Sequence, residues 1–277
     1  MLMLSLSLLL GAFVGVSLGL TGGGGSLLAV PMLVYGLHVT ASQAVGASLA
    51  AVGAVSAMGA VQRWRAGQLE TRVGLLFAAA GMLGAPIGTW IGRRVPQAAL
   101  LIAFAILMLV IAFRMWRQAV RDPRSASAVR ARLDSDGDDV SPFCQFDPAG
   151  RLLIDSRCGR ALSVAGLVAG VLSGLFGVGG GFIIVPALVF FTHMSVHRAV
   201  ATSLLVIALV CASGLTSFLV GGGGLPLALT TLFGLGGVAG MRLGTVIARR
   251  LSPVGLQKLF AVAIVSIAIF VLAKNLG

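Results

Sequence analysis

A glycine-rich apolar phrase occurs twice in this chain and constrains its fold more than any other feature. The first copy is GLTGGGGSLLAVPMLVYGLHVTASQAVGASL (residues 19–49), and the second is GLFGVGGGFIIVPALVFFTHMSVHRAVATSL (residues 174–204). The copies align without a gap. A later phrase also repeats, GAPIGTWIGRRV at residues 84–95 and GMRLGTVIARRL at residues 240–251. The chain therefore consists of two related halves, and duplicated apolar segments interrupted by Gly and Pro are typical of secondary transporters.

The composition restricts the chain to the class of integral membrane proteins. Of its 277 residues, 58% are hydrophobic and only 10% are charged, and the mean hydropathy is +1.04. A soluble domain of this size cannot bury so much apolar surface, whereas runs of roughly 20 apolar residues can cross a bilayer as helices. The apolar N-terminus lacks a positively charged start and runs directly into the first repeat, so we expect it to stay in the mature chain. We predict an all-α polytopic membrane protein.

The apolar segments divide the chain into a first membrane repeat (1–119), a polar linker (120–160) and a second membrane repeat (161–277). Each repeat has two short apolar segments around the glycines and then three long segments. Because glycine opposes a continuous helix, we predict that each short pair is a broken or re-entrant segment, which gives about eight segments by hydropathy. The expected segments are Met3–Leu18, Ser26–Leu37, Ala41–Gln62, Thr71–Gly92 and Gln97–Gln118, and then Ala161–Phe176, Gly181–Thr192, Val196–Val220, Leu225–Ala248 and Pro253–Ala273.

The positions of the arginines favour an inverted arrangement of the repeats. Arginines gather between the first two long segments and after the third, and basic loops usually face the cytoplasm. If each repeat crosses the membrane an odd number of times, the second repeat is inverted, and only Arg93, Arg94 and Lys274 break this rule. With four crossings per repeat, the repeats are parallel and more arginines lie outside. We therefore predict inverted repeats and a cytoplasmic linker.

The linker has two parts. Its beginning mixes arginine and aspartate and is typical of a flexible, solvated connection. Its end has two short apolar stretches around an Asp-Pro-Ala-Gly turn at residues 147–150, which predicts a small β-hairpin. Cys144 and Cys158 flank this hairpin. Two interpretations stay open for them, either reduced cytosolic thiols or a redox or metal clip at the base of the hairpin.

The acidic residues lie outside every predicted membrane segment. Glu70 is in a loop, and all the others are in the linker. Proton relays and cation sites within membranes usually contain Asp or Glu, so their absence argues against a cation pump and favours an anionic substrate. The net charge of +12 fits arginines in cytoplasmic loops rather than a nucleic-acid-binding surface. We expect no metal, no cofactor and no enzymatic activity, since no His, Cys or carboxylate groups converge within the membrane.

The glycine loops are the predicted binding site. Glycine lets consecutive backbone N–H groups turn toward one ligand, and each loop opens a short helix whose positive end would point to that ligand. The alternative is that these glycines only allow close helix packing. The candidate substrate-binding residues are Gly22, Gly24, Gly25 and Ser26 in the first repeat and Gly177, Gly179, Gly180 and Gly181 in the second.

Further candidates are hydroxyl groups, prolines and polar residues within or after the short helices. The hydroxyls either bind an oxyanion or only join neighbouring helices, and the prolines would act as hinges. Arg242 is a charge deep in an apolar segment, where it either coordinates the anion or extends to the membrane surface. The other candidates are Ser48, Thr202 and Ser203 as hydroxyls, Pro31 and Pro186 as hinges, and His38, His193, Gln43 and Arg198 as gating residues.

These motifs resemble those of the sulfite exporter family TauE/SafE. The resemblance rests on two copies of G-L-x-G-x-G-G followed by V-P-x-L, on a downstream A-V-x-x-S-L, and on G-x-x-x-G-T before paired arginines. It implies an integral permease of the bacterial inner membrane that moves sulfite or related organosulfur anions out of the cell. Two features depart from the pattern. Ser26 stands where the second copy has Gly181. The linker is longer than the family needs, so the resemblance implies no role for the linker.

We therefore expect a secondary transporter that exports a small anion, sulfite or a sulfonate-like compound, by alternating access around the glycine loops. One alternative is an anion channel, which would show no saturation. Another is a membrane scaffold that binds a partner protein, in which the loop glycines would tolerate alanine. The expected partners are a small anionic substrate and the lipid bilayer. A homo-oligomer is left open, and nucleic acid is not expected.

Overall fold

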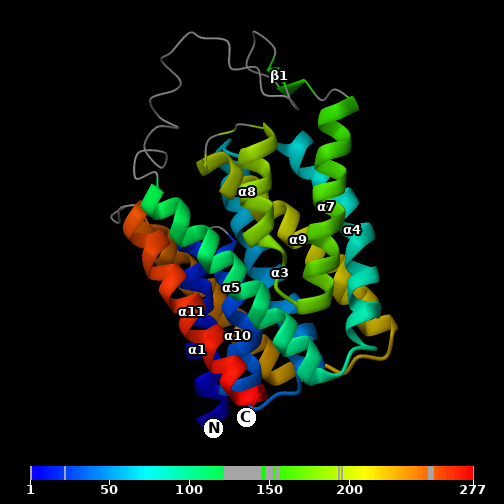
Figure 1. Ribbon diagram of the computed structural model, residues 1–277, viewed down its shortest axis with the longest axis vertical. Helices are drawn as coiled ribbons and strands as arrows, with labels where there is room; N and C mark the ends of the chain where they lie inside the picture. Colours follow the sequence, from blue (N-terminus) through cyan, green and yellow to red (C-terminus); the bar gives the residue numbers. More distant parts are fainter. Residues whose placement is uncertain are drawn as a thin grey trace.

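The computed structural model describes residues 2–21, 23–121, 145–146, 152–153, 156–192, 194, 196–248 and 253–276. In these residues both repeats fold into helices that lie side by side in one bundle (Figure 1). Six of the described helices are long and apolar enough to cross a membrane. The prediction of an all-α polytopic membrane protein is confirmed.

The elements of the two repeats follow each other in the same order. Both have a first helix, a glycine loop, a short helical region and three long helices. The first repeat contains α1 (Leu2–Thr21), the 3-10 turn η1 (Gly24–Leu28), α2 (Ala29–Pro31), the π-helical turn η2 (Met32–Gly36), α3 (Ala41–Arg65), α4 (Thr71–Gly92) and α5 (Gln97–Arg121). The second contains α7 (Ser156–Phe176), α8 (Gly181–Thr192), α9 (Val196–Val220), α10 (Leu227–Ala248) and α11 (Pro253–Leu276).

The first helix of each repeat is longer than the sequence predicted. α1 has 20 residues and α7 has 21. At ~1.5 Å per residue each extends about 30 Å, which is enough to cross a bilayer. α7 begins at Ser156 rather than at Ala161, because its first turn takes up the polar residues that were assigned to the linker. The prediction of a short first segment was wrong for both helices, whereas the interruption at the glycines is present.

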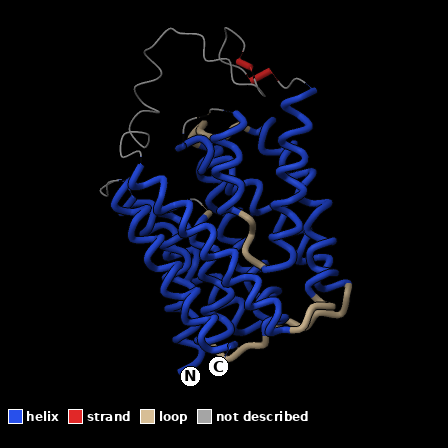
Figure 2. Tube along the Cα trace, in the orientation of Figure 1, coloured by secondary structure: helices blue, strands red, loops and turns tan. Residues whose placement is uncertain are grey.

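The glycines between α7 and α8 form the turn of a helical hairpin. Residues 177–180 are buried and belong to neither helix. Their loop lies within the body of the molecule rather than at its end, and α8 leads back toward the end at which α7 begins (Figures 1 and 2). In the first repeat the region from η1 to η2 takes the place of α8, and η1 packs against α1. Each repeat therefore contains a re-entrant segment next to its first helix.

The two repeats are interlocked through their first helices. α1 packs along α10 of the other repeat, and α7 packs along α4. A Cβ atom on Gly15 would lie 2.0 Å from the carbonyl oxygen of Gly237, and one on the equivalent Gly170 would lie 2.1 Å from that of Gly81. Small residues let helix backbones approach this closely in membranes. Each repeat thus completes the packing of the other.

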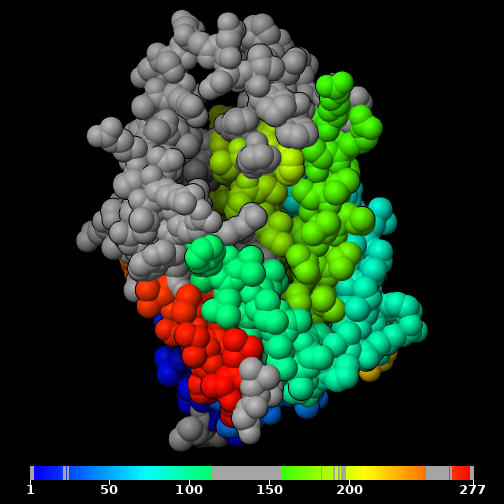
Figure 3. Space-filling model, viewed as in Figure 1, coloured from blue at the N-terminus to red at the C-terminus, as the bar shows by residue number. Residues whose placement is uncertain are grey.

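Equivalent helices of the two repeats also meet each other. α3 packs against α9, and α5 packs against α11. α5 and α11 lie side by side on one face (Figure 3) and run in opposite directions, since α5 ends near the start of the linker while α11 ends near the C-terminus at the other end of the molecule (Figure 1).

The outer surface of the bundle is apolar. Leu83 is 70% exposed, and Phe113 and Leu243 are each 61% exposed. Exposed apolar surface of this extent marks an interaction with a membrane or another protein. Together with the length of the helices, it fits a molecule whose sides contact lipid.

Two short strands lie in the region where the sequence predicted a hairpin. β1 (Gln145–Phe146) pairs antiparallel with β2 (Leu152–Leu153). Cys158, in the first turn of α7, is buried and disulfide-bonded, whereas Cys211 is a free thiol. Cys144 and the turn at residues 147–150 lie outside the described residues.

Candidate functional site

The loop between α7 and α8 has a backbone that glycine adopts far more easily than other residues. The φ angles of Gly177, Gly179 and Gly180 are 69°, 70° and 68°, which is the left-handed region. The loop is also tightly packed, because a Cβ atom on Gly177 would lie 2.7 Å from the Cα atom of Val45. These glycines therefore serve both the turn and the contact with α3.

The two glycine loops meet at the centre of the molecule. A Cβ atom on Gly181 would lie 2.5 Å from the Cα atom of Gly23, and one on Gly25 would lie 2.4 Å from the backbone nitrogen of Leu18. The structure thus brings the loops together as the duplicated sequence suggested. Close packing is one role of these glycines. Gly22 lies outside the described residues.

The hydroxyl groups near the loops donate to backbone carbonyls. Ser26 Oγ donates to the carbonyl oxygen of Gly23 at 2.7 Å, and Ser48 Oγ donates to that of Gly177 at 2.5 Å. Ser203 Oγ donates to Val200 of its own helix at 2.9 Å. The bond from Ser48 crosses between the repeats, so it ties α3 of the first repeat to the glycine loop of the second.

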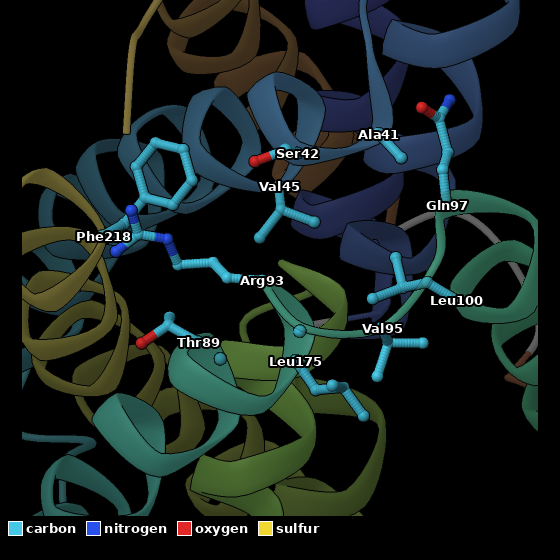
Figure 4. Close-up of a pocket in the computed structure, with 12 residues that line it drawn as sticks. Ala41, Ser42, Val45, Thr89, Arg93, Val95, Gln97, Leu100, Leu175 and Phe218 are labelled. Atoms are coloured by element: carbon cyan, nitrogen blue, oxygen red, sulfur yellow. The ribbon is translucent and has the colours of Figure 1, made fainter. Parts of the chain in front are cut away.

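A cavity of about 190 Å³ lies at the end of the molecule where α4 joins α5 (Figure 4). It is enclosed by the ends of α3, α4, α5 and α7 and by α9. Gly174 and Leu175 line it just before the loop that starts at Gly177, so the cavity lies beside one of the predicted binding loops. The lining residues are Ala41, Ser42, Val45, Thr89, Gly92, Arg93, Val95, Gln97, Leu100, Gly174, Leu175 and Phe218.

Arg93 gives this cavity its charge. Its side chain runs across the cavity toward Phe218 (Figure 4), and its guanidinium lies so close to Gly221 that a Cβ atom there would overlap it. In the part of the chain that the structure describes, Glu70 is the only acidic residue, and it pairs with Arg198. No described carboxylate therefore neutralises Arg93. The N-termini of α3 and α5 and the C-termini of α4, α7 and α9 lie here, so the helix dipoles largely oppose each other. Arg93 is the charged residue among those that line the cavity.

Hydrogen-bonding groups complete the cavity. Thr89 Oγ1 donates to the carbonyl oxygen of Pro86 at 2.9 Å and lies 2.9 Å from Ser217 Oγ. Ser42 and Gln97 add a hydroxyl and an amide to the lining. A guanidinium together with neutral donors suits a small oxyanion, because bonds to a charged partner are stronger than neutral ones. Within the described residues, no group of three His, Cys, Asp or Glu is placed to hold a metal ion.

Sequence reasoning missed Arg93 and Thr89 as site residues. Both lie in the second repeated phrase, GAPIGTWIGRRV, and Arg93 was one of the exceptions to the charge rule for cytoplasmic loops. These two signals together could have found them. A basic residue away from the basic end of a membrane protein needs a reason other than topology, and a cavity for an anion supplies one.

The remaining candidates are not among the residues that line this cavity. Arg242 is exposed on α10, and Arg198 is on the first turn of α9. Gln43 belongs to the cap of α3, since its backbone N–H donates to Thr40 Oγ1 at 3.4 Å and its side-chain oxygen accepts from the same hydroxyl at 3.1 Å. His38 has a φ of 53° in the connection before α3.

The two predicted hinges fall within the short helical regions. Pro31 ends α2, where the chain passes into η2, and Pro186 lies inside α8. Gly24 is the first residue of η1. His193 lies outside the described residues.

Comparison with known proteins identifies the family of this chain. A bundle with six described helices that are long and apolar enough to cross a membrane belongs to the class of polytopic membrane proteins. The chain belongs to the sulfite exporter TauE/SafE family, whose sequence model matches residues 7–271. No solved structure matches the chain.

Its relatives carry names of the same class. A probable membrane transporter protein of Xylella fastidiosa (strain Temecula1 / ATCC 700964) is 33% identical over 96% of this chain and 93% of its own length. Its counterpart in strain 9a5c is also 33% identical, over the same shares of both chains. The probable membrane transporter protein YdhB of Bacillus subtilis (strain 168) is 26% identical over 70% of this chain and 69% of its own length. The chain is therefore a membrane transporter.

Proposed function

We propose that this transporter moves a small anion, sulfite or a related organosulfur anion, across the bacterial inner membrane. The observation that carries the proposal is Arg93, a cation in a cavity that no described carboxylate neutralises. Arg93 is exposed at the end of α4, so its guanidinium is accessible to a ligand of opposite charge beside the glycine loop. The family description supports sulfite as the first anion to test.

In this proposal the anion enters the cavity at Arg93 and passes to the glycine loops. Ser42 and Gln97 hydrogen-bond it in the cavity, whereas Thr89 keeps its hydroxyl hydrogen on the carbonyl of Pro86. The loop at residues 177–180 lies next on its way. The loop glycines, with Ser26 and Ser48 bonded to their carbonyls, remain the proposed inner part of the site, and Pro31 and Pro186 its hinges. Thr202 and Ser203, on α9 nearer the linker end, remain proposed ligands beyond the loops.

We further propose that the repeats are inverted in the membrane and that the linker is cytoplasmic. The opposite directions of α5 and α11 support inversion. Basic residues gather at the end that carries the linker, among them Arg63, Arg65 and Arg72. The cavity then opens to the outside of the cell, and alternating access moves the same site to the cytoplasmic side.

The test is uptake by proteoliposomes of sulfite, sulfate, thiosulfate and small sulfonates, with Arg93→Gln beside the wild type. If Arg93 makes a charge-assisted hydrogen bond worth about 1.5–3 kcal/mol, the variant should lose about ten- to 150-fold in apparent affinity.

The matched control is Arg94→Gln. Arg94 lies 3.5 Å from the centre of the Trp90 ring and does not line the cavity. The Arg94→Gln variant removes the same charge from the same loop and should keep an apparent affinity for the anion close to that of the wild type. Unchanged affinity in Arg93→Gln, or saturable transport of a metal cation, would overturn the proposal. Anion flux without saturation would favour a channel instead.

A further inference from the structure

We propose that Glu70 and Arg198 form a gate that keeps the linker end of the molecule closed and opens when the transporter changes the side to which its site is accessible. The inference rests on the proposed transport function, but the contact itself is independent of the identity of the anion. It concerns the end of the molecule opposite the Arg93 cavity.

The gate joins the two repeats by two contacts. Arg198 Nη1 lies 2.6 Å from Glu70 Oε1, and the backbone N–H of Glu70 donates to Thr202 Oγ1 at 3.1 Å. Glu70 precedes α4, whereas Arg198 and Thr202 lie one turn apart on α9. Since Thr202 is completely buried, the loop before α4 is fastened to α9 both at the surface and beneath it. The loop is also braced internally, because Arg63 donates to Gln68 at 3.2 Å.

The repeat shows that this contact exists at one end only. Gln43 is the equivalent of Arg198, Ala47 is the equivalent of Thr202, and Pro226 precedes α10 as Glu70 precedes α4. Glutamine and proline cannot form an ion pair, proline has no N–H to donate, and alanine has no hydroxyl to accept. The contact between the loop and the helix therefore cannot form at the other end.

The open cavity lies at the position equivalent to the gate. The N-terminus of α3 lines the cavity through Ala41, Ser42 and Val45, and the N-terminus of α9, its equivalent, carries Arg198. Where one end has a cavity, the other has an ion pair and a partly buried hydrogen bond. This difference is what a transporter with inverted repeats shows when it is open to one side.

The strength of the contact suits a gate. The side chains of Arg198 and Glu70 are 55% and 38% exposed, and exposed ion pairs change an equilibrium by no more than about fivefold. Such a contact can favour the closed end and still break in every cycle. Once it breaks, Arg198 has no other described carboxylate to pair with, so its guanidinium becomes available to an anion that passes this end.

The experiment follows the opening of this end with a cysteine at Ser203. Ser203 is completely buried on α9, one residue beyond Thr202, and Ser203→Cys is nearly isosteric. The rate at which a water-soluble maleimide labels this cysteine in purified protein measures how often the linker end opens. Labelling of the same variants without Ser203→Cys is subtracted, because Cys211 is also a free thiol.

Glu70→Gln and Arg198→Gln should each raise the labelling rate about two- to fivefold. The charge-swapped double variant Glu70→Arg with Arg198→Glu should restore the slow rate, which a merely destabilised protein would not do. Arg94→Gln, which removes an arginine at the opposite end, should leave labelling unchanged. Unchanged labelling in Glu70→Gln, or a swapped variant as fast as the single ones, would overturn the gate.

The labelling needs no substrate, so its result is separate from that of the transport assay. If no anion is transported but the swap restores slow labelling, the gate stands and the proposed anion transport fails. If anions are transported with the expected dependence on Arg93 but labelling does not respond to Glu70, the gate fails alone.

Discussion

The glycine loops of the two repeats have the same sequence pattern but different conformations. In the second repeat, three glycines with φ near 70° form a turn, and α8 follows as a continuous helix. In the first, no residue from Gly23 to Leu28 has a left-handed φ, and the chain passes through η1, α2 and η2. One sequence difference contributes, because Ser26 donates to the carbonyl of Gly23 whereas the equivalent Gly181 has no side chain.

This comparison shows that the repeated sequence places a glycine loop in each half, whereas the packing around each loop determines its conformation. The loop of the second repeat is held against Val45 of the first repeat and against Ala169, and Ser48 donates to its Gly177. Because the halves differ, one end of the molecule has a cavity with Arg93 and the other has the Glu70–Arg198 contact. The proposed alternating access would rest on such unlike conformations of equivalent segments.

The largest expected effect comes from the turn of the second loop. Gly177→Ala combines a left-handed φ, which costs about 1–2 kcal/mol for a residue with a Cβ, with a clash against the backbone of Val45, which costs about 1–3 kcal/mol. We expect a loss of about 2–5 kcal/mol in the free energy of unfolding, measured as a lower Tm in detergent.

Gly67→Ala is the matched control for this prediction. Gly67 has a φ of 67°, but a Cβ atom there would have no neighbour within 4 Å. It therefore isolates the backbone term, and the expected loss is only about 1–2 kcal/mol. Equal losses in the two variants would show that the loop is not clamped against α3.

The glycine phrases also show how much of the fold could be predicted from the sequence. The duplication, the interruption at each glycine phrase and the helical membrane fold follow from composition and periodicity. The exchange of first helices between repeats does not, because the spacing of Gly11, Gly15 and Gly19 shows a face for close packing but does not identify α10 as its partner. The lengths of α1 and α7 were missed because polar residues or glycines at their ends resemble loops in sequence.

The cavity could not be predicted from the sequence for a related reason. Its lining comes from the ends of five helices that are far apart along the chain, and Arg93 and Phe218 approach each other only through the packing of α4 with α9. The paired loops were predicted because they are duplicated. Arg93 and Thr89 are duplicated too, but their phrase ends a helix and contains no glycine run that suggests a ligand.

The second prediction sharpens the comparison of the loops through their serines. Ser48→Ala removes a buried hydrogen bond between the repeats, and Ser26→Ala removes one within the first loop. Interhelical hydrogen bonds in membranes are worth about 0.6 kcal/mol on average and up to about 1.7. We expect Ser48→Ala to lose about 0.6–1.7 kcal/mol of stability in a thermal melt.

Ser26→Ala should lose less than Ser48→Ala, because its bond spans only three residues of one turn. The carbonyl oxygen of Gly23 also keeps the bond from the backbone N–H of residue 26, at 3.4 Å. A larger loss in Ser26→Ala would mean that the first loop, rather than the second, depends on its side chains for its conformation.

The smallest effect is expected at Arg242, which separates the two arginines that the sequence and the structure suggest for the anion. Arg242 is exposed on α10 and does not line the cavity, whereas Arg93 crosses it. An exposed substitution away from partners changes free energy by about 0.5 kcal/mol or less, so Arg242→Gln should change the apparent affinity for sulfite by no more than about twofold.

Uptake measured for Arg242→Gln beside Arg93→Gln decides which of the two arginines binds the anion. A loss at Arg242 that equals the loss at Arg93 would place the anion on α10 as well, and the cavity at α4 would then be an entrance rather than the whole site. A loss confined to Arg93 assigns Arg242 to the membrane surface, where a long basic side chain can reach water and lipid headgroups.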